Sequence, residues 1–112
     1  MSHDLNLYLD DILKACEKVL RFSSNLTFES FVEDEKTFDA IIRNLEAIGE
    51  AAKHLPDIFC QNFPEIEWKK IRNFRDIIAH ECFGIDERIV WDIVQNKIPL
   101  LLKHLSEGKQ AI

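Results

Sequence analysis

Apolar residues recur three and four positions apart along almost the whole chain, which is the spacing that places side chains on one face of an α-helix. Three glycines and three prolines in 112 residues are too few for a β-rich or disordered chain. The length suits one domain with a core of its own, to which a partner subunit would add stability. We therefore expect a single domain over residues 1–112 with an all-α fold, an antiparallel bundle of four to five helices.

Capping and breaking residues predict where the first helices begin and end. A first helix is expected over residues 4–22, followed by a short turn or helix from Thr27 to Val32. Asp34 suits the N-cap of a second long helix, because its carboxylate can accept a backbone N–H of the first turn. That helix should end before Pro56.

Two more helices are predicted in the second half of the chain. Ile58 and Phe59 lie in a connection, where we expect them to cover one end of the core. A third helix is expected over residues 64–81, because the proline at its start suits the first turn. Asp86 should cap the last helix, and Pro99 should kink it, since the ring removes one backbone hydrogen bond.

Charge and cysteine content limit the function classes. The formal net charge is -6, with 20 acidic against 14 basic residues, which disfavours broad, non-specific nucleic-acid binding but allows a locally basic site. The three cysteines form no CxxC pair, and no apolar signal segment opens the chain, so we expect reduced thiols in a cytoplasmic protein. The apolar runs are too short to cross a membrane.

The predicted third helix concentrates positive charge. Lys69, Lys70, Arg72 and Arg75 follow one another with no acidic residue among them, and His80 comes five positions after Arg75. Cations can hold a phosphodiester, and a histidine can move a proton near neutral pH. If nucleic acid binds, we expect it to bind at the stretch from Trp68 to His80 and nowhere else.

Helical geometry places these side chains on a polar strip opposite the core. At about 100° per residue, Arg75 and His80 lie about 140° apart and bracket a shallow site. The opposite arc is apolar and should be buried: Ile71, Phe74, Ile77 and Ile78. A basic strip of this kind is more often a solvated face than a catalytic one, so spacing alone does not establish a site.

Family resemblance adds to this reading. The segments 42–51 (IRNLEAIGEA) and 68–76 (WKKIRNFRD), His80, Phe83–Asp86 and Val90–Trp91 together resemble HepT, the HEPN toxin of the HepT–MntA toxin–antitoxin pair. The resemblance spans nearly the whole chain. It implies a HEPN-like fold and a metal-independent endoribonuclease without a cofactor. It also implies a homodimer with an Arg and a His from each protomer in one cleft.

The HepT motif Arg-x4-His maps onto Arg75 and His80, and Asp76 stands where a polar residue commonly follows the arginine. The expected reaction is attack of an RNA 2′-OH on the adjacent phosphorus. His80 would exchange protons, Arg75 would hold the phosphoryl oxygens, and Asp76 would orient one of them. Lys69 and Arg72 would position phosphates without reading bases.

One position departs from the family pattern. HepT proteins carry a tyrosine two residues after the histidine, to which the MntA nucleotidyltransferase attaches AMP, and this chain has Cys82 there. Its one tyrosine, Tyr8, is far away in sequence. The resemblance still implies an MntA-like nucleotidyltransferase partner, but we expect no AMP at Cys82. On its residues alone, Cys82 could equally be a small buried side chain.

Other constellations give weaker indications. His80-Glu81 lacks the second histidine of an HExxH zinc motif, since position 84 is glycine, so no metal site is expected. Glu46 and Glu50 are one turn apart and could orient a catalytic group, although such a pair is usually a solvated face. Asn44 is equally unassigned.

A second class of function also fits the residues. A non-catalytic HEPN subunit could bind a nucleotidyltransferase together with its nucleotide or nucleic acid. RNA cleavage by the purified chain in chelator would distinguish this class from a ribonuclease.

Overall fold

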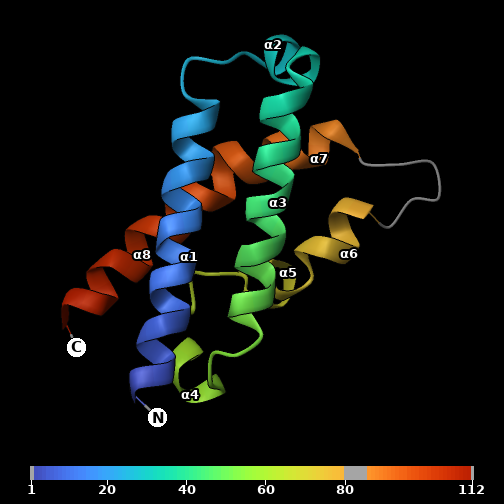
Figure 1. Cartoon of the computed structure of the whole chain (residues 1–112). Coiled ribbons are helices and arrows are strands. Elements are labelled where there is room, and N and C mark those ends of the chain that lie inside the picture. The colour runs from blue at the N-terminus through green and yellow to red at the C-terminus, as the bar shows by residue number, and fades with distance from the viewer. Residues whose placement is uncertain (1, 80–85, 112) are drawn as a thin grey trace.

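The computed structural model describes residues 2–79 and 86–111, and within these residues every regular element is helical, so the expectation of an all-α fold is confirmed (Figure 1). The elements in chain order are α1 (Ser2–Ser23), α2 (Phe28–Glu33), α3 (Glu35–Ala52), α4 (Asp57–Cys60), α5 (Trp68–Arg72), α6 (Phe74–Ala79), α7 (Glu87–Asp92), the π-helical η1 (Ile93–Lys97) and α8 (Ile98–Ala111).

Two long helices form the centre of the bundle. Helices α1 and α3 run antiparallel, side by side, and share the most extensive contact of the fold. Helix α8 packs on α1, while α5 and α6 pack on α3 (Figure 1). The segment that carries Arg75 is therefore held by α3.

The two predicted N-caps are confirmed. The Asp34 carboxylate accepts a hydrogen bond from the Thr37 backbone N–H at 3.1 Å, at the start of α3. The Asp86 carboxylate accepts from the backbone N–H groups of Arg88 at 3.0 Å and Ile89 at 3.3 Å, at the start of α7. Each contact satisfies backbone donors that the first helical turn leaves unpaired.

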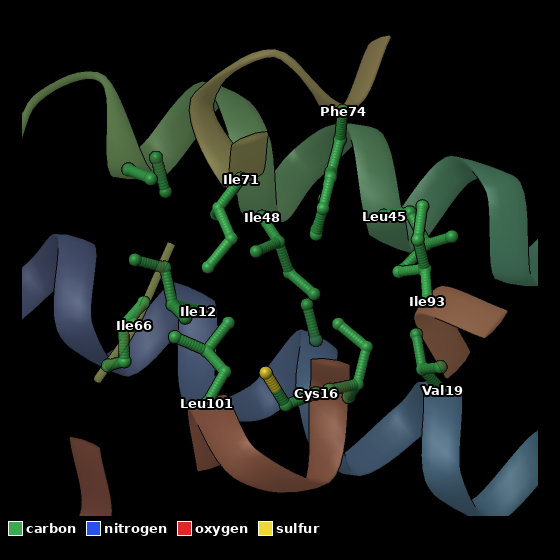
Figure 2. Packing of buried hydrophobic residues seen from close by; sticks show 14 of the residues in the cluster. Ile12, Cys16, Val19, Leu45, Ile48, Ile66, Ile71, Phe74, Ile93 and Leu101 are labelled. Carbon is green, nitrogen blue, oxygen red and sulfur yellow. The ribbon is translucent and has the colours of Figure 1, made fainter. Parts of the chain in front are cut away.

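The core is one continuous cluster to which α1, α3, α5–α6 and the last helices all contribute (Figure 2). Phe31 and Phe74 are the largest fully buried side chains. Phe59 is buried as predicted, but the prediction for Ile58 is wrong because its side chain is 75% exposed. The two residues are neighbours in the single turn of α4, which can direct only one of them inward.

The third helix begins later than predicted and is interrupted. It starts at Trp68 instead of Pro64, and a break at Asn73 divides it into α5 and α6. Asn73 has φ -102° and ψ 18°, outside the helical region. The residues predicted at its C-terminal end, 80 and 81, lie outside the described residues.

The late start has a local cause. The Trp68 indole Nε1–H donates to the carbonyl oxygens of Cys60 at 3.1 Å and Phe63 at 3.2 Å. The first of these carbonyls ends α4, and the second lies in the turns that connect α4 to α5. A buried indole N–H needs a partner, so this contact outweighs the tendency of proline to begin a helix.

The last helix is disturbed where Pro99 predicted a kink. Its residues 93–97 form a π turn, in which the Ile98 N–H bonds to the Ile93 carbonyl five residues back. A proline has no N–H to donate, and its ring crowds the carbonyl four residues earlier, here that of Gln95. The wider π turn accommodates both consequences within an otherwise helical segment.

Candidate active site

Helices α5 and α6 bury the apolar side chains that the sequence assigned to the core. Ile71, Phe74 and Ile78 are 4%, 1% and 1% exposed, and Figure 2 shows Ile71 and Phe74 directed into the cluster. Ile77 is half-buried, so its side chain is less covered than predicted. It packs against the core cluster from the edge of the apolar arc and also lines a groove. The polar side of α6 presents Arg75 to solvent.

Gly49 determines how closely α3 approaches this segment. A Cβ atom at Gly49 would stand 3.0 Å from the carbonyl oxygen of Ile71 and 3.5 Å from Cβ of Phe74. These contacts fall on either side of the α5–α6 break. Because glycine has no side chain, α3 can pack closely against α5 and against α6, the helix that carries Arg75.

Arg72 is engaged in contacts within the protein. Its Nε–H donates to the Ala52 carbonyl at 3.4 Å, and Nη2 lies 3.1 Å from Sγ of Cys60 and 3.7 Å from a carboxylate oxygen of Asp57. The side chain is about a quarter exposed. Arg72 thus ties the C-terminal end of α3 to α4, and its predicted RNA contact stays a prediction.

Lys70 is also paired. One carboxylate oxygen of Glu67 lies 2.9 Å from Lys70 Nζ, and the other lies 2.7 Å from Lys97 Nζ on η1. The hydrogen bonds from Lys97 and Lys70 lower the pKa of Glu67 to about 2. In the part of the chain that the structure describes, Lys69 and Arg75 are the exposed cations of the basic segment that form no ion pair.

A groove of about 380 Å³ separates α5 and α6 from the last three helical elements. Its floor is apolar and includes Ile71, Phe74 and Ile77, and the Glu67 ion pairs stand among its polar wall residues. The groove occupies the flank of α6 that Ile77 marks, about 160° around the helix from Arg75. The polar strip and this groove are therefore different surfaces.

The motif is only partly described by the structure. Arg75 and Asp76 are both exposed on adjacent positions of α6, whereas His80 and Cys82 lie outside the described residues. Among the residues that are described, no group of three or more His, Cys, Asp or Glu side chains could hold a metal ion.

The unassigned residues of α3 differ in their contacts. Glu50 pairs with Lys53 at 3.1 Å, and both side chains are about half exposed, as expected of a solvated face. The Asn44 side-chain amide donates to the Ala40 carbonyl at 2.8 Å on the same helix. Glu46 is half-buried.

Sequence reasoning missed one pair of residues. The rings of Tyr8 and His54 stack at a centroid distance of 4.5 Å with an angle of 5° between planes. They lie 46 positions apart in sequence, and the antiparallel pairing of α1 and α3 brings them together. No pattern within a single helix indicates this contact, because Tyr8 is on α1 and His54 lies in the turn that follows α3.

Comparison with known proteins assigns the chain to a family. The family model "Ribonuclease HepT-like" matches residues 12–107. A protein of Methanocaldococcus jannaschii, named as a candidate RNase, is 42% identical over 104 residues, which cover 93% of this chain and 86% of the relative. "Probable ribonuclease HepT" of Thermococcus cleftensis is 44% identical over 94 residues, covering 84% and 86%. No solved structure gives a significant match.

This chain therefore belongs to the HepT-like ribonuclease family, and its bundle is a HEPN-like fold. The resemblance read from the two sequence phrases and the motif is confirmed. Family membership supports an RNase activity for the chain. None of the described helices is long and apolar enough to cross a membrane.

Proposed function

We propose that this protein is a metal-independent endoribonuclease toxin that cleaves RNA through Arg75 and His80. The observation that carries the proposal is the family match over residues 12–107, which includes the whole Arg-x4-His motif. The exposure of Arg75 on a helix that is firmly seated on α3 agrees with it. A guanidinium that forms no ion pair among the described residues is available to a phosphate.

The proposed reaction is transesterification. The RNA 2′-oxygen attacks the adjacent phosphorus, the 5′-oxygen of the next nucleotide leaves, and the products are a 2′,3′-cyclic phosphate and a 5′-hydroxyl. His80 takes or gives the proton, since an unperturbed histidine titrates near pH 6.5. Arg75 stabilises the negative charge that builds on the phosphoryl oxygens. Asp76 orients His80 or the partner protomer's guanidinium.

The proposed active unit is a homodimer. The motif supplies one histidine per chain, and one imidazole cannot readily be both the base and the acid in a single step. Two chains that face each other would supply two histidines, one as the base and one as the acid. Lys69, exposed on α5, would hold a phosphate next to the cleaved bond.

A second candidate function is a non-catalytic subunit that binds a nucleotidyltransferase. The groove between α6 and the last helices favours it, because an apolar floor with charged walls suits a protein contact. The proposed toxin would also have an MntA-like nucleotidyltransferase as its partner, so binding alone does not separate the two candidates.

Analysis of the reaction products does separate them. The purified protein is incubated with RNA in excess chelator, and the new 3′ ends are identified by mass spectrometry. A ribonuclease of the proposed type leaves 2′,3′-cyclic phosphates without added metal. Intact RNA, or 3′-hydroxyl ends that appear only with divalent metal, would exclude the proposed mechanism.

A further inference from the structure

We infer that the groove between α1 and α3 is a second contact surface for single-stranded RNA, away from the Arg75 strip. Its volume is about 470 Å³, and its walls combine a pair of stacked rings with lysines. The inference rests on the proposed function for the identity of the ligand and extends it to a surface with no role in the cleavage motif.

The stacked rings provide a platform for a base. Tyr8 is half-buried and His54 is exposed, so the imidazole is the more accessible ring of the stacked pair. A nucleobase can stack on the outer face of such a ring whatever its sequence, because every base has a π face. Neither ring is used by the proposed cleavage reaction.

Cations line the same surface together with carboxylates. A smaller hollow that shares Asn44 extends the groove along α3, and the two carry four cations: Lys14, Lys18, Lys36 and Arg43. Three carboxylates lie among them: Asp11, Asp39 and Glu50. Lys53 neutralises one of these, that of Glu50, at 3.1 Å. The groove alone therefore balances two lysines against two carboxylates, and the groove and hollow together carry one more cation than carboxylates, in a chain whose overall charge is -6.

This combination selects a ligand class. A free anion would use only the cations of the groove and would leave the stacked rings without a role. An apolar ligand would use neither the lysines nor the carboxylates. Backbone phosphates on lysines, together with a base stacked on an aromatic ring, are how proteins hold single strands without reading their sequence. The openness of the groove suits a strand that passes through it.

The position of the groove allows one RNA to reach both surfaces. The groove uses the face of α3 that carries Ala47 and Ala51, whereas Gly49 on the opposite face seats α5 and α6. A helix with its side chains is about 10–12 Å across, and Arg75 is exposed on α6 beyond α3, so the strand would have to pass around α3 and reach α6. The groove would then bind nucleotides of the RNA that are distant from the phosphodiester bond being cleaved.

Binding of an RNA that cannot be cleaved tests the lysines directly. A short, fluorescent, single-stranded 2′-O-methyl RNA lacks the attacking hydroxyl, and its affinity is measured by anisotropy at several salt concentrations. Lys14→Ala and Lys18→Ala should each weaken binding about three- to tenfold and lower the salt slope by about 0.7. Lys103→Ala is the matched control, since Lys103 is an exposed lysine on α8 outside the groove.

The rings are tested by shape-preserving substitutions. His54→Ala should weaken binding about 5- to 100-fold, the range of one lost base stack, while His54→Phe retains most of the affinity. Tyr8→Phe should match wild type, because stacking needs the ring and not the hydroxyl. His54 is exposed, so these variants should fold, which circular dichroism verifies.

The outcomes separate this inference from the proposed function. Equal affinity for wild type, Lys14→Ala and Lys18→Ala would overturn the inference even if RNA is cleaved. A change of oligomeric state in the lysine variants would also overturn it, because the groove would then be an interface between copies. If RNA binding depends on the lysines but the protein cleaves no RNA, the groove binds RNA as inferred and the proposed ribonuclease function is wrong.

Discussion

The backbone carbonyl oxygen of Ile71 lies 3.0 Å from the place that a Cβ atom of Gly49 would occupy. Real Cβ atoms rarely come so near to a carbonyl, and the neighbour here is backbone and cannot rotate away. This contact joins α3 to the segment that carries Arg75, so a side chain at position 49 would push that segment outward.

We expect Gly49→Ala to lower the free energy of unfolding by about 1–3 kcal/mol, the usual cost of overpacking. Helix propensity alone would have the opposite effect, because alanine in a helix is favoured over glycine by about 1 kcal/mol. Urea denaturation measures the change. Ala47→Gly, at an exposed position of the same helix, calibrates the propensity term, and a more stable Gly49→Ala protein would contradict the close packing.

The Glu67 ion pairs predict a pH dependence of stability. The pKa of Glu67 is lowered to about 2 in the folded protein, from 4.5, by Lys97 and Lys70. A lowered carboxyl pKa means that the pairs contribute stability above about pH 4.5, and that this contribution is lost as the pH falls toward about 2. Because the carboxylate is exposed, solvent screening keeps the contribution small.

Glu67→Gln should therefore destabilise the protein at pH 7 and leave its stability close to that of wild type near pH 2, as measured by thermal unfolding across this range. Added salt should shrink the difference at pH 7. Glu65→Gln serves as the control, since Glu65 is exposed nearby and shows no such pair in the part of the chain described. A difference between Glu67→Gln and wild type that persists near pH 2 would refute the electrostatic explanation.

Helical periodicity predicted most of the bundle because burial follows it closely, and the caps at Asp34 and Asp86 were predicted because their chemistry is local. The start of α5 could not be predicted in the same way. It depends on the Trp68 indole meeting carbonyls up to eight residues away. The break at Asn73 has no comparable signal in the periodicity.

The candidate site was predicted unevenly for the same reason. The exposure of Arg75 and Asp76 follows from their positions on the helix, about 100° and about 160° around it from Phe74. The contacts of Arg72 do not, because they join α5 to residues 12 to 20 positions away. The Tyr8–His54 stack likewise depends on how two helices pair, which a single helical pattern does not contain.

The oligomeric state follows from the proposed chemistry. We expect light scattering at micromolar concentration to give twice the chain mass of 13.1 kDa, since the proposed reaction uses one histidine from each of two protomers. A mixture of Arg75→Ala and His80→Ala chains should regain part of the activity if residues from both protomers act together. A monomer at the concentration at which RNA is cleaved would rule out the shared cleft.

Regulation by the proposed nucleotidyltransferase partner should differ from that of HepT proteins with a tyrosine, because this chain has a cysteine at position 82. Cysteine lacks the phenolic oxygen that receives AMP in HepT proteins, so the partner with ATP and magnesium should leave this position unmodified. Cys82→Tyr should restore the transfer, which intact-mass spectrometry detects as an AMP-sized addition. An adduct mapped to Cys82, or none on the tyrosine variant, would show that this position has another role.

The most direct test of the central claim is the rate of RNA cleavage in excess chelator by the wild-type protein, Arg75→Ala and His80→Ala. A lost proton-transfer group typically costs about 10²–10⁴-fold in rate, so His80→Ala should be nearly inactive. Arg75→Ala should fall by a similar factor while it keeps wild-type stability, because its side chain is exposed. Lys103→Ala should cleave at the wild-type rate. Undiminished cleavage by His80→Ala would contradict the account.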